Sequence, residues 1–129
     1  MALTKQEYYD LLVTTSRNGG FPAVRVDDYC FNNCVYRGGD GRKCAVGLIM
    51  PDDRYKKELE GTTASHVCKV CGTDWVPKGI TAEDLENIQS AHDNLSNGDW
   101  RHIDFVTELD QLVCFADVQK ENHAIPVNA

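Results

Sequence analysis

Three cations surround a glycine-rich turn in the stretch "YRGGDGRK". Arg37 precedes the turn, and Arg42 and Lys43 follow it; we call residues 37–43 the basic loop. Successive backbone N–H groups in such a turn can form a concavity for an anion, and arginine forks donate charge-assisted hydrogen bonds to phosphate oxygens. The stretch carries a formal charge of +2, since Asp40 offsets one cation, in a chain of net charge −7. The pattern indicates a site for a small phosphate-bearing anion.

Two tyrosines, Tyr36 and Tyr55, flank the basic loop in sequence and offer stacking surfaces for a nucleobase. Such a contact contributes about 1–3 kcal/mol per base. The spacing is not that of a phosphate-binding loop followed by a helical lysine and hydroxyl, so a nucleoside triphosphatase is not expected. The alternative is a solvated hairpin tip whose cations are neutralised by Asp52 and Asp53, because exposed ion pairs are weak.

The six cysteines form the second group of candidate residues. Cys68 and Cys71 stand in a C-x-x-C-G pattern typical of a zinc knuckle, and Cys30 and Cys34 can supply a second pair. Against a zinc site, the Cys30–Cys34 spacing is looser than usual, and buried cysteine also behaves as a small apolar group. No metal is therefore expected, and a zinc-stabilised module that binds a host protein through its acidic surface stays as an alternative.

A cysteine-dependent reaction is a further alternative. Cys44 follows Lys43, and a place at the start of a short helix would further lower its thiol pKa. The candidate bases are His66, His92 and His102, but no spacing pairs any of them with Cys44, and His92 lies on an apolar stripe. The chain is therefore expected not to be an enzyme and to need no cofactor.

The elements that must position these residues are mainly helices. Thr4 and Glu7 fit a capping box, which predicts a first helix from Lys5 to Arg17. Thr81 and Asp84 predict the start of a second helix, which Asn97-Gly98 ends. Its apolar stripe is Leu85, Ile88, His92 and Leu95.

A third helix is predicted after Asp99, which can cap it. Its buried face is Phe105, Leu109, Leu112 and Cys114 or Phe115. Between the first two helices, the turn at 38–41 predicts a β-hairpin. A four-residue loop places Arg37 opposite Arg42, and a two-residue turn places it opposite Cys44; the sequence leaves both registers open. The apolar run from Cys44 to Met50 fits either a buried strand or a short buried helix.

These elements predict one α+β domain over residues 1–129, with at least three helices, one β-hairpin between the first and second, and a loose tail at 120–129. No signal-peptide pattern opens the chain, and no apolar stretch approaches the roughly 20 residues that span a bilayer. A net charge of −7 argues against binding long nucleic acid. A cytoplasmic protein without membrane contact is expected.

From residue 34 to residue 61 the chain resembles a set of small phage-encoded proteins. Their shared segment reads C-x-Y-R-x-x-D-G-x-K-C-A-x-G-x-L-I-P-D, followed by a tyrosine and Glu-Gly. The matching residues are Cys34, Tyr36, Arg37, Asp40, Gly41, Lys43, Cys44, Ala45, Gly47, Asp52, Tyr55, Glu60 and Gly61. The match departs at 48–50, and Pro51 fits after a slip of one position.

This set is similar to the anti-CBASS sponge proteins, which bind cyclic dinucleotide signals such as cyclic GMP–AMP and withhold them from host defence effectors without chemistry. The resemblance implies a phage-encoded protein that acts in the cytoplasm of an infected bacterium. The ligand-binding residues that it implies are Tyr36, Arg37, Asp40, Lys43 and Tyr55, with Arg42 as a local addition. A cyclic dinucleotide is roughly two-fold symmetric, so a homo-oligomer with the site at its interface is expected.

Overall fold

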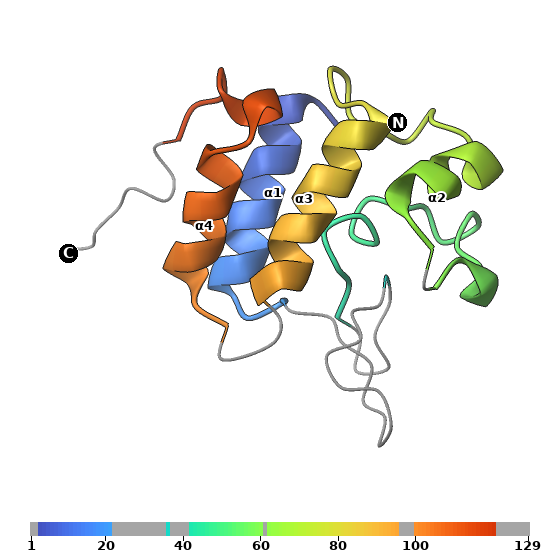
Figure 1. Cartoon of the computed structure of the whole chain (residues 1–129), viewed down its shortest axis with the longest axis horizontal. Helices are drawn as coiled ribbons and strands as arrows, with labels where there is room; N and C mark the ends of the chain where they lie inside the picture. The colour runs from blue at the N-terminus through green and yellow to red at the C-terminus, as the bar shows by residue number, and fades with distance from the viewer. Residues whose placement is uncertain (1–2, 22–35, 37–41, 61, 96–99, 121–129) are drawn as a thin grey trace.

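Capped amphipathic helices build most of the structure, a computed structural model that describes residues 3–21, 36, 42–60, 62–95 and 100–120. Its elements are α1 (Lys5–Arg17), η1 (Lys57–Leu59), α2 (Ala64–Cys71), α3 (Ala82–Leu95), α4 (His102–Asp110) and η2 (Val113–Phe115). Helix α3 packs against both α2 and α4, and α4 packs against α1 (Figure 1). Among the helices of these residues, none combines the length and hydropathy that a membrane crossing requires.

The first two predicted helices are confirmed. Helix α1 spans Lys5–Arg17, and the Thr4 and Glu7 side chains each accept a hydrogen bond from the other residue's backbone N–H. The Thr81 hydroxyl and the Asp84 carboxylate exchange the same pair of bonds at the start of α3. These caps satisfy N–H groups that a helix leaves without partners, which explains why the starts could be predicted from short sequence patterns.

The core lies between α1, α3 and α4. Its largest fully buried apolar side chains include Tyr8, Tyr9, Leu12, Leu85, Ile88, Phe105, Leu109 and Phe115. His92 belongs to this core, as predicted, since its side chain is 0% exposed and its ring lies 5.3 Å from that of Phe21 and 5.5 Å from that of Trp100. Its Nδ1 lies 2.9 Å from a carboxylate oxygen of Asp93, so the buried imidazole keeps a polar partner.

The third predicted helix is confirmed as α4, although it is shorter than the apolar pattern indicated. Helix α4 ends at Asp110. Cys114 and Phe115 are buried as well, but they lie in the following 3₁₀ turn η2. The predicted cap, Asp99, lies outside the described residues. Most of the predicted tail at 120–129 lies outside them as well, and Lys120, its first residue, donates a hydrogen bond from Nζ to the backbone oxygen of Phe115.

The predicted β-hairpin is wrong, and so is the α+β class: the protein is helical, with no strand in the parts of the chain that the structure describes. The segment expected to pair curls into a turn, in which Leu48 N donates to Cys44 O at 2.8 Å and Met50 N to Val46 O at 3.2 Å. These bonds use the backbone groups that a strand would offer to a partner. The turn at 38–41 lies outside the described residues.

Helix α2 occupies a segment for which no element was predicted. Thr63 caps it by accepting a hydrogen bond from His66 N, and Gly72, at a φ of 81°, ends it. Cys68 and Cys71 lie three residues apart on its buried face. The C-x-x-C pattern is therefore part of the apolar stripe of a short helix.

Candidate functional site

The structure describes only part of the predicted ligand-binding set. Arg37 and Asp40 lie outside the described residues. The described members are Tyr36, Arg42, Lys43 and Tyr55. Arg42 is exposed and Lys43 is partly exposed, so both cations reach the surface at the end of the basic loop. The two tyrosines belong to a hydrogen-bonded group that no residue type or spacing had indicated.

The carboxylate of Glu60 holds this group together. One of its oxygens accepts a hydrogen bond from Tyr36 N at 2.7 Å, and the other accepts one from the Tyr55 hydroxyl at 2.6 Å. Bonds to a charged acceptor contribute about 1.5–3 kcal/mol each when they are shielded from water, and both of these are partly buried. We call Tyr36, Tyr55 and Glu60 the Glu60 anchor. Glu60 is one of the matching residues in the resemblance at residues 34–61, and that match is the sequence signal that could have identified it.

Tyr36 serves as the fixed start of the basic loop. Its ring is 5% exposed, its hydroxyl donates to Thr62 O, and its own carbonyl accepts a hydrogen bond from Cys44 N at 3.2 Å. That last bond joins the residues on either side of the basic loop. A ring buried to this extent offers no face to a nucleobase, whereas the Tyr55 ring remains partly exposed.

Gly47 lets the turn after the basic loop press against Tyr36. A Cβ atom at Gly47 would lie 2.0 Å from the carbonyl oxygen of Tyr36, which is far inside van der Waals contact. The Gly47 N–H donates to Cys44 Sγ at 3.3 Å. The close approach of two backbones therefore depends on the absence of a side chain at this position.

Two helices hold the same turn from the other side. The Tyr8 hydroxyl of α1 donates to Ala45 O at 2.6 Å, and the Gln89 side chain of α3 accepts from Val46 N at 3.1 Å. Both ends of the basic loop are thus attached to the core through named hydrogen bonds. Such an arrangement presents Arg42 and Lys43 from a fixed base, which lowers the entropy lost when a ligand orders them.

The anchor gives a prediction for the Tyr55→Phe variant. Loss of the hydroxyl should raise the rate of tryptic cleavage after Arg42 and Lys43 about tenfold, because a bond to a charged acceptor contributes about 1.5 kcal/mol or more. Limited proteolysis followed by mass spectrometry measures the rate.

The control for Tyr55→Phe is Tyr9→Phe, which removes a 2.7 Å bond from a tyrosine to the Asp110 carboxylate between α1 and α4. Faster cleavage after Arg42 and Lys43 in both variants would mean that the tyrosine at 55 stabilises the whole fold and has no specific effect on the basic loop.

The thiol of Cys44 is not an activated nucleophile. Burial raises its pKa to about 12, and the N–H groups of Gly47 and Val46, which favour the thiolate, do not offset this. The lowered pKa expected beside Lys43 is therefore wrong at this position. A thiol that is protonated at neutral pH and 0% exposed is poorly suited to attack a substrate.

Alkaline pH should destabilise the protein through this thiol. In the unfolded chain it ionises near its ordinary pKa of 9.0, whereas in the folded chain it stays protonated up to about 12. Its contribution to stability is thus complete below the first value and declines as the pH rises toward the second. Between about pH 8 and pH 10.5 the loss should be about 2 kcal/mol. Urea unfolding of the wild type and Cys44→Ala measures it, and equal losses in both would contradict the assignment.

The cysteines of α2 show no metal-binding arrangement in the described chain. The Cys71 thiol donates a hydrogen bond to Arg54 O at 3.3 Å, and burial raises the pKa of the Cys68 thiol. Over the described ranges, no three His, Cys, Asp or Glu side chains are grouped as a metal site would require. Cys30 and Cys34, the second pair of the zinc alternative, lie outside the described residues.

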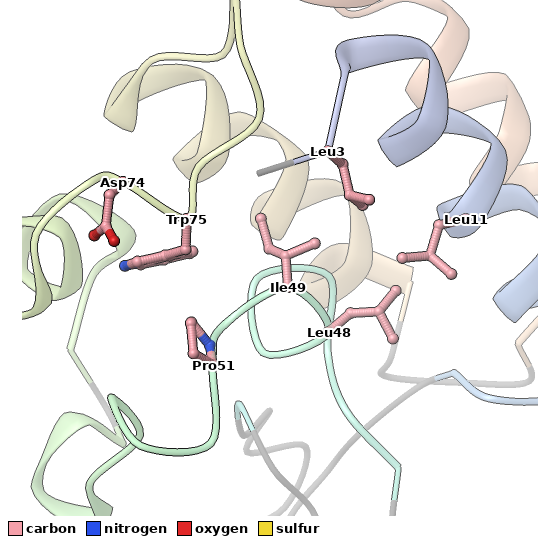
Figure 2. Close-up of a pocket in the computed structure, with 7 residues that line it drawn as sticks. All are labelled: Leu3, Leu11, Leu48, Ile49, Pro51, Asp74 and Trp75. Atoms are coloured by element: carbon pink, nitrogen blue, oxygen red, sulfur yellow. The ribbon is translucent and has the colours of Figure 1, made fainter. Parts of the chain in front are cut away.

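A pocket of about 340 Å³ lies beside the C-terminal part of the turn at 44–50, which follows the basic loop. Its aliphatic lining is Leu3, Leu11, Leu48, Ile49 and Pro51. Asp74 and Trp75 close one end, while Leu3, Leu11 and Leu48 lie at the other (Figure 2). We call this the Trp75 pocket. No residue type or spacing in the sequence predicts it, since its walls come from three distant segments.

No family model matches the chain, and comparison with curated proteins and with solved structures finds no match. The function must therefore be inferred from the geometry of the basic loop, its charge, and the resemblance carried by residues 34–61.

Proposed function

We propose that the chain binds a small phosphate-bearing nucleotide at the basic loop and holds it without changing it chemically. The observation that carries this proposal is the attachment of both loop ends to the core by the Glu60 anchor and the Cys44–Tyr36 bond. A plain solvated loop has no need of a partly buried carboxylate that fixes the residue before it. A site that must meet a charged ligand gains affinity when its cations are held in place.

The ligand class best matched to this loop is a cyclic dinucleotide such as cyclic GMP–AMP. Arg42 and Lys43 supply donors for phosphate oxygens, and the sequence adds Arg37 at the other end of the loop. The partly exposed Tyr55 ring provides a stacking face for a base. The resemblance to anti-CBASS sponge proteins supports the same class. Tyr36 contributes by anchoring the loop, and Asp40 is proposed to bind the ligand, as the resemblance implies.

In this proposal the protein is made by a phage and acts in the cytoplasm of the infected bacterium. By sequestering the nucleotide it blocks the signal that activates host antiphage defence. Because the ligand is roughly two-fold symmetric, the proposal includes a homo-oligomer with the site at the interface. Native mass spectrometry that detects only monomer, with and without cyclic GMP–AMP, would remove this part of the proposal.

Recovery of the ligand separates a sponge from an enzyme. Cyclic GMP–AMP is incubated with an equimolar amount of protein, the protein is denatured by heat, and the supernatant is analysed by chromatography. A sponge depletes the free nucleotide before heating and returns it intact afterwards. Recovery of a linear or cleaved product would show catalysis and overturn the proposal.

A further inference from the structure

The Trp75 pocket points to a second function, and we propose that it binds a protein partner. The partner inserts an apolar side chain into the pocket and carries a basic residue next to that side chain. The inference is independent of nucleotide binding, because it uses other residues of the chain. It depends on three features of the pocket: walls that are already fixed, a lining that includes five aliphatic residues and is open on one side, and acidic side chains near one end.

Hydrogen bonds hold the walls of the pocket in place. Lys78 N donates to Leu3 O at 3.3 Å, which attaches the start of the chain to the segment after Trp75. Arg54 donates to both carboxylate oxygens of Asp74, at 2.7 and 2.9 Å, and to Cys71 O at 2.6 Å. The pocket is therefore formed before any partner arrives, which favours recognition by a rigid surface.

The interior suits a side chain delivered by another protein. Its five aliphatic residues are all only partly buried, so the pocket stays open along one side, while the Trp75 ring, 6% exposed, forms a firm end wall. Small-molecule sites enclose most of their ligand, whereas an open apolar pocket receives an anchor residue from a partner. A volume of about 340 Å³ accommodates a large aliphatic or aromatic side chain.

Charge at the Trp75 end selects the flanking residue. Asp52 and Asp53 follow Pro51 directly and are exposed, and the Asp74 side chain is 70% exposed. Arg54 forms an ion pair with Asp74, and the neighbouring Asp53 adds a further exposed carboxylate. The Arg54 guanidinium holds the pKa of Asp74 below its ordinary value, so this carboxylate stays ionised. A cationic residue beside the anchor is favoured, whereas nucleotide phosphates are repelled.

Selection from a displayed library of random twelve-residue peptides against the full-length protein tests the proposal. Enriched peptides should share a Leu, Ile, Phe, Met or Trp within a few positions of Lys or Arg. Ile49→Asp, which places a charge in the pocket wall, should weaken their binding at least about tenfold. Val113→Asp is the matched control, because Val113 is 89% exposed in η2, and it should leave binding unchanged.

A second pair of variants guards against misfolding of Ile49→Asp. Asp53→Asn alters an exposed side chain and should weaken the basic peptides about threefold or more at low salt, whereas Glu108→Gln, an equal charge change on α4, should have no effect. The proposal is overturned if the library yields no enriched peptides, if the enriched peptides are acidic, or if their binding is insensitive to Ile49→Asp in a folded protein. Equal weakening by Asp53→Asn and Glu108→Gln would also overturn it.

Discussion

Replacement of Gly47 by alanine is expected to lower the free energy of unfolding by about 3 kcal/mol or more. The added Cβ atom would lie 2.0 Å from the Tyr36 carbonyl oxygen and 2.8 Å from its carbonyl carbon. Both atoms belong to the backbone, so no side-chain rotation relieves the contact. The turn at 44–50 would have to move away from Tyr36, and the hydrogen bond from Cys44 N would be lost with it.

Gly19→Ala is the control for this prediction. Gly19 has a φ of 80° and no heavy atom within 4 Å of its would-be Cβ, so alanine meets backbone strain alone. The expected loss there is about 1–2 kcal/mol. Urea unfolding measures both variants. A Gly47→Ala protein no less stable than Gly19→Ala would show that the turn does not press against Tyr36.

Simultaneous replacement of Arg42 and Lys43 by alanine is expected to weaken binding of cyclic GMP–AMP at least about 100-fold. Each cation that donates a charge-assisted hydrogen bond to phosphate contributes about 1.5–3 kcal/mol, and two of them together contribute about 3 kcal/mol or more. Both side chains reach the surface, so the fold should tolerate the change. Equilibrium dialysis with labelled nucleotide measures the affinity.

The matched control removes the same charge elsewhere. Lys69 on α2 and Lys78 before α3 are exposed, and their joint replacement by alanine should change the affinity less than about twofold. An equal loss in the two double variants would mean that the nucleotide senses only the overall charge of the protein. An unchanged affinity in the Arg42 and Lys43 variant would mean that the basic loop is solvated surface.

The helices could be predicted because their signals are local. The residue pairs Thr4–Glu7 and Thr81–Asp84 each form a closed set of hydrogen bonds within one turn of chain, so neighbouring residues suffice to place α1 and α3. Helix α2 was missed for the opposite reason. It has only eight residues, and the pattern around its two cysteines was weighed as a zinc knuckle or as buried apolar groups, without a helix being predicted there.

The hairpin could not be judged from the turn residues alone. Glycine and aspartate favour a tight turn, but a strand also needs a partner with unused backbone groups. The bonds of Leu48 and Met50 within the following turn show that those groups were already engaged. Tertiary contacts of this segment with Tyr8 and Gln89, and the close approach at Gly47, favour the turn over a strand.

The candidate site was predicted in part. Residue types alone singled out the cations at the loop end; Arg42 and Lys43 reach the surface, and their role in binding stays a prediction. Tyr36 was expected to stack on a nucleobase, but it is buried and forms three hydrogen bonds that anchor the start of the basic loop. Several positions of the segment of resemblance have this structural role, because Cys44, Gly47 and Glu60 each lie against Tyr36 at the base of the loop.

Isothermal titration calorimetry of cyclic GMP–AMP into the full-length protein tests the central claim most directly. We predict saturable binding at a fixed ratio of ligand to chain, weakened by raised salt because the contacts are charged. Circular dichroism on the same sample verifies that the helices are intact. A titration without binding heat at two temperatures, with cyclic GMP–AMP and with other cyclic dinucleotides, on protein of intact helicity would contradict the claim that the basic loop is built to hold such a ligand.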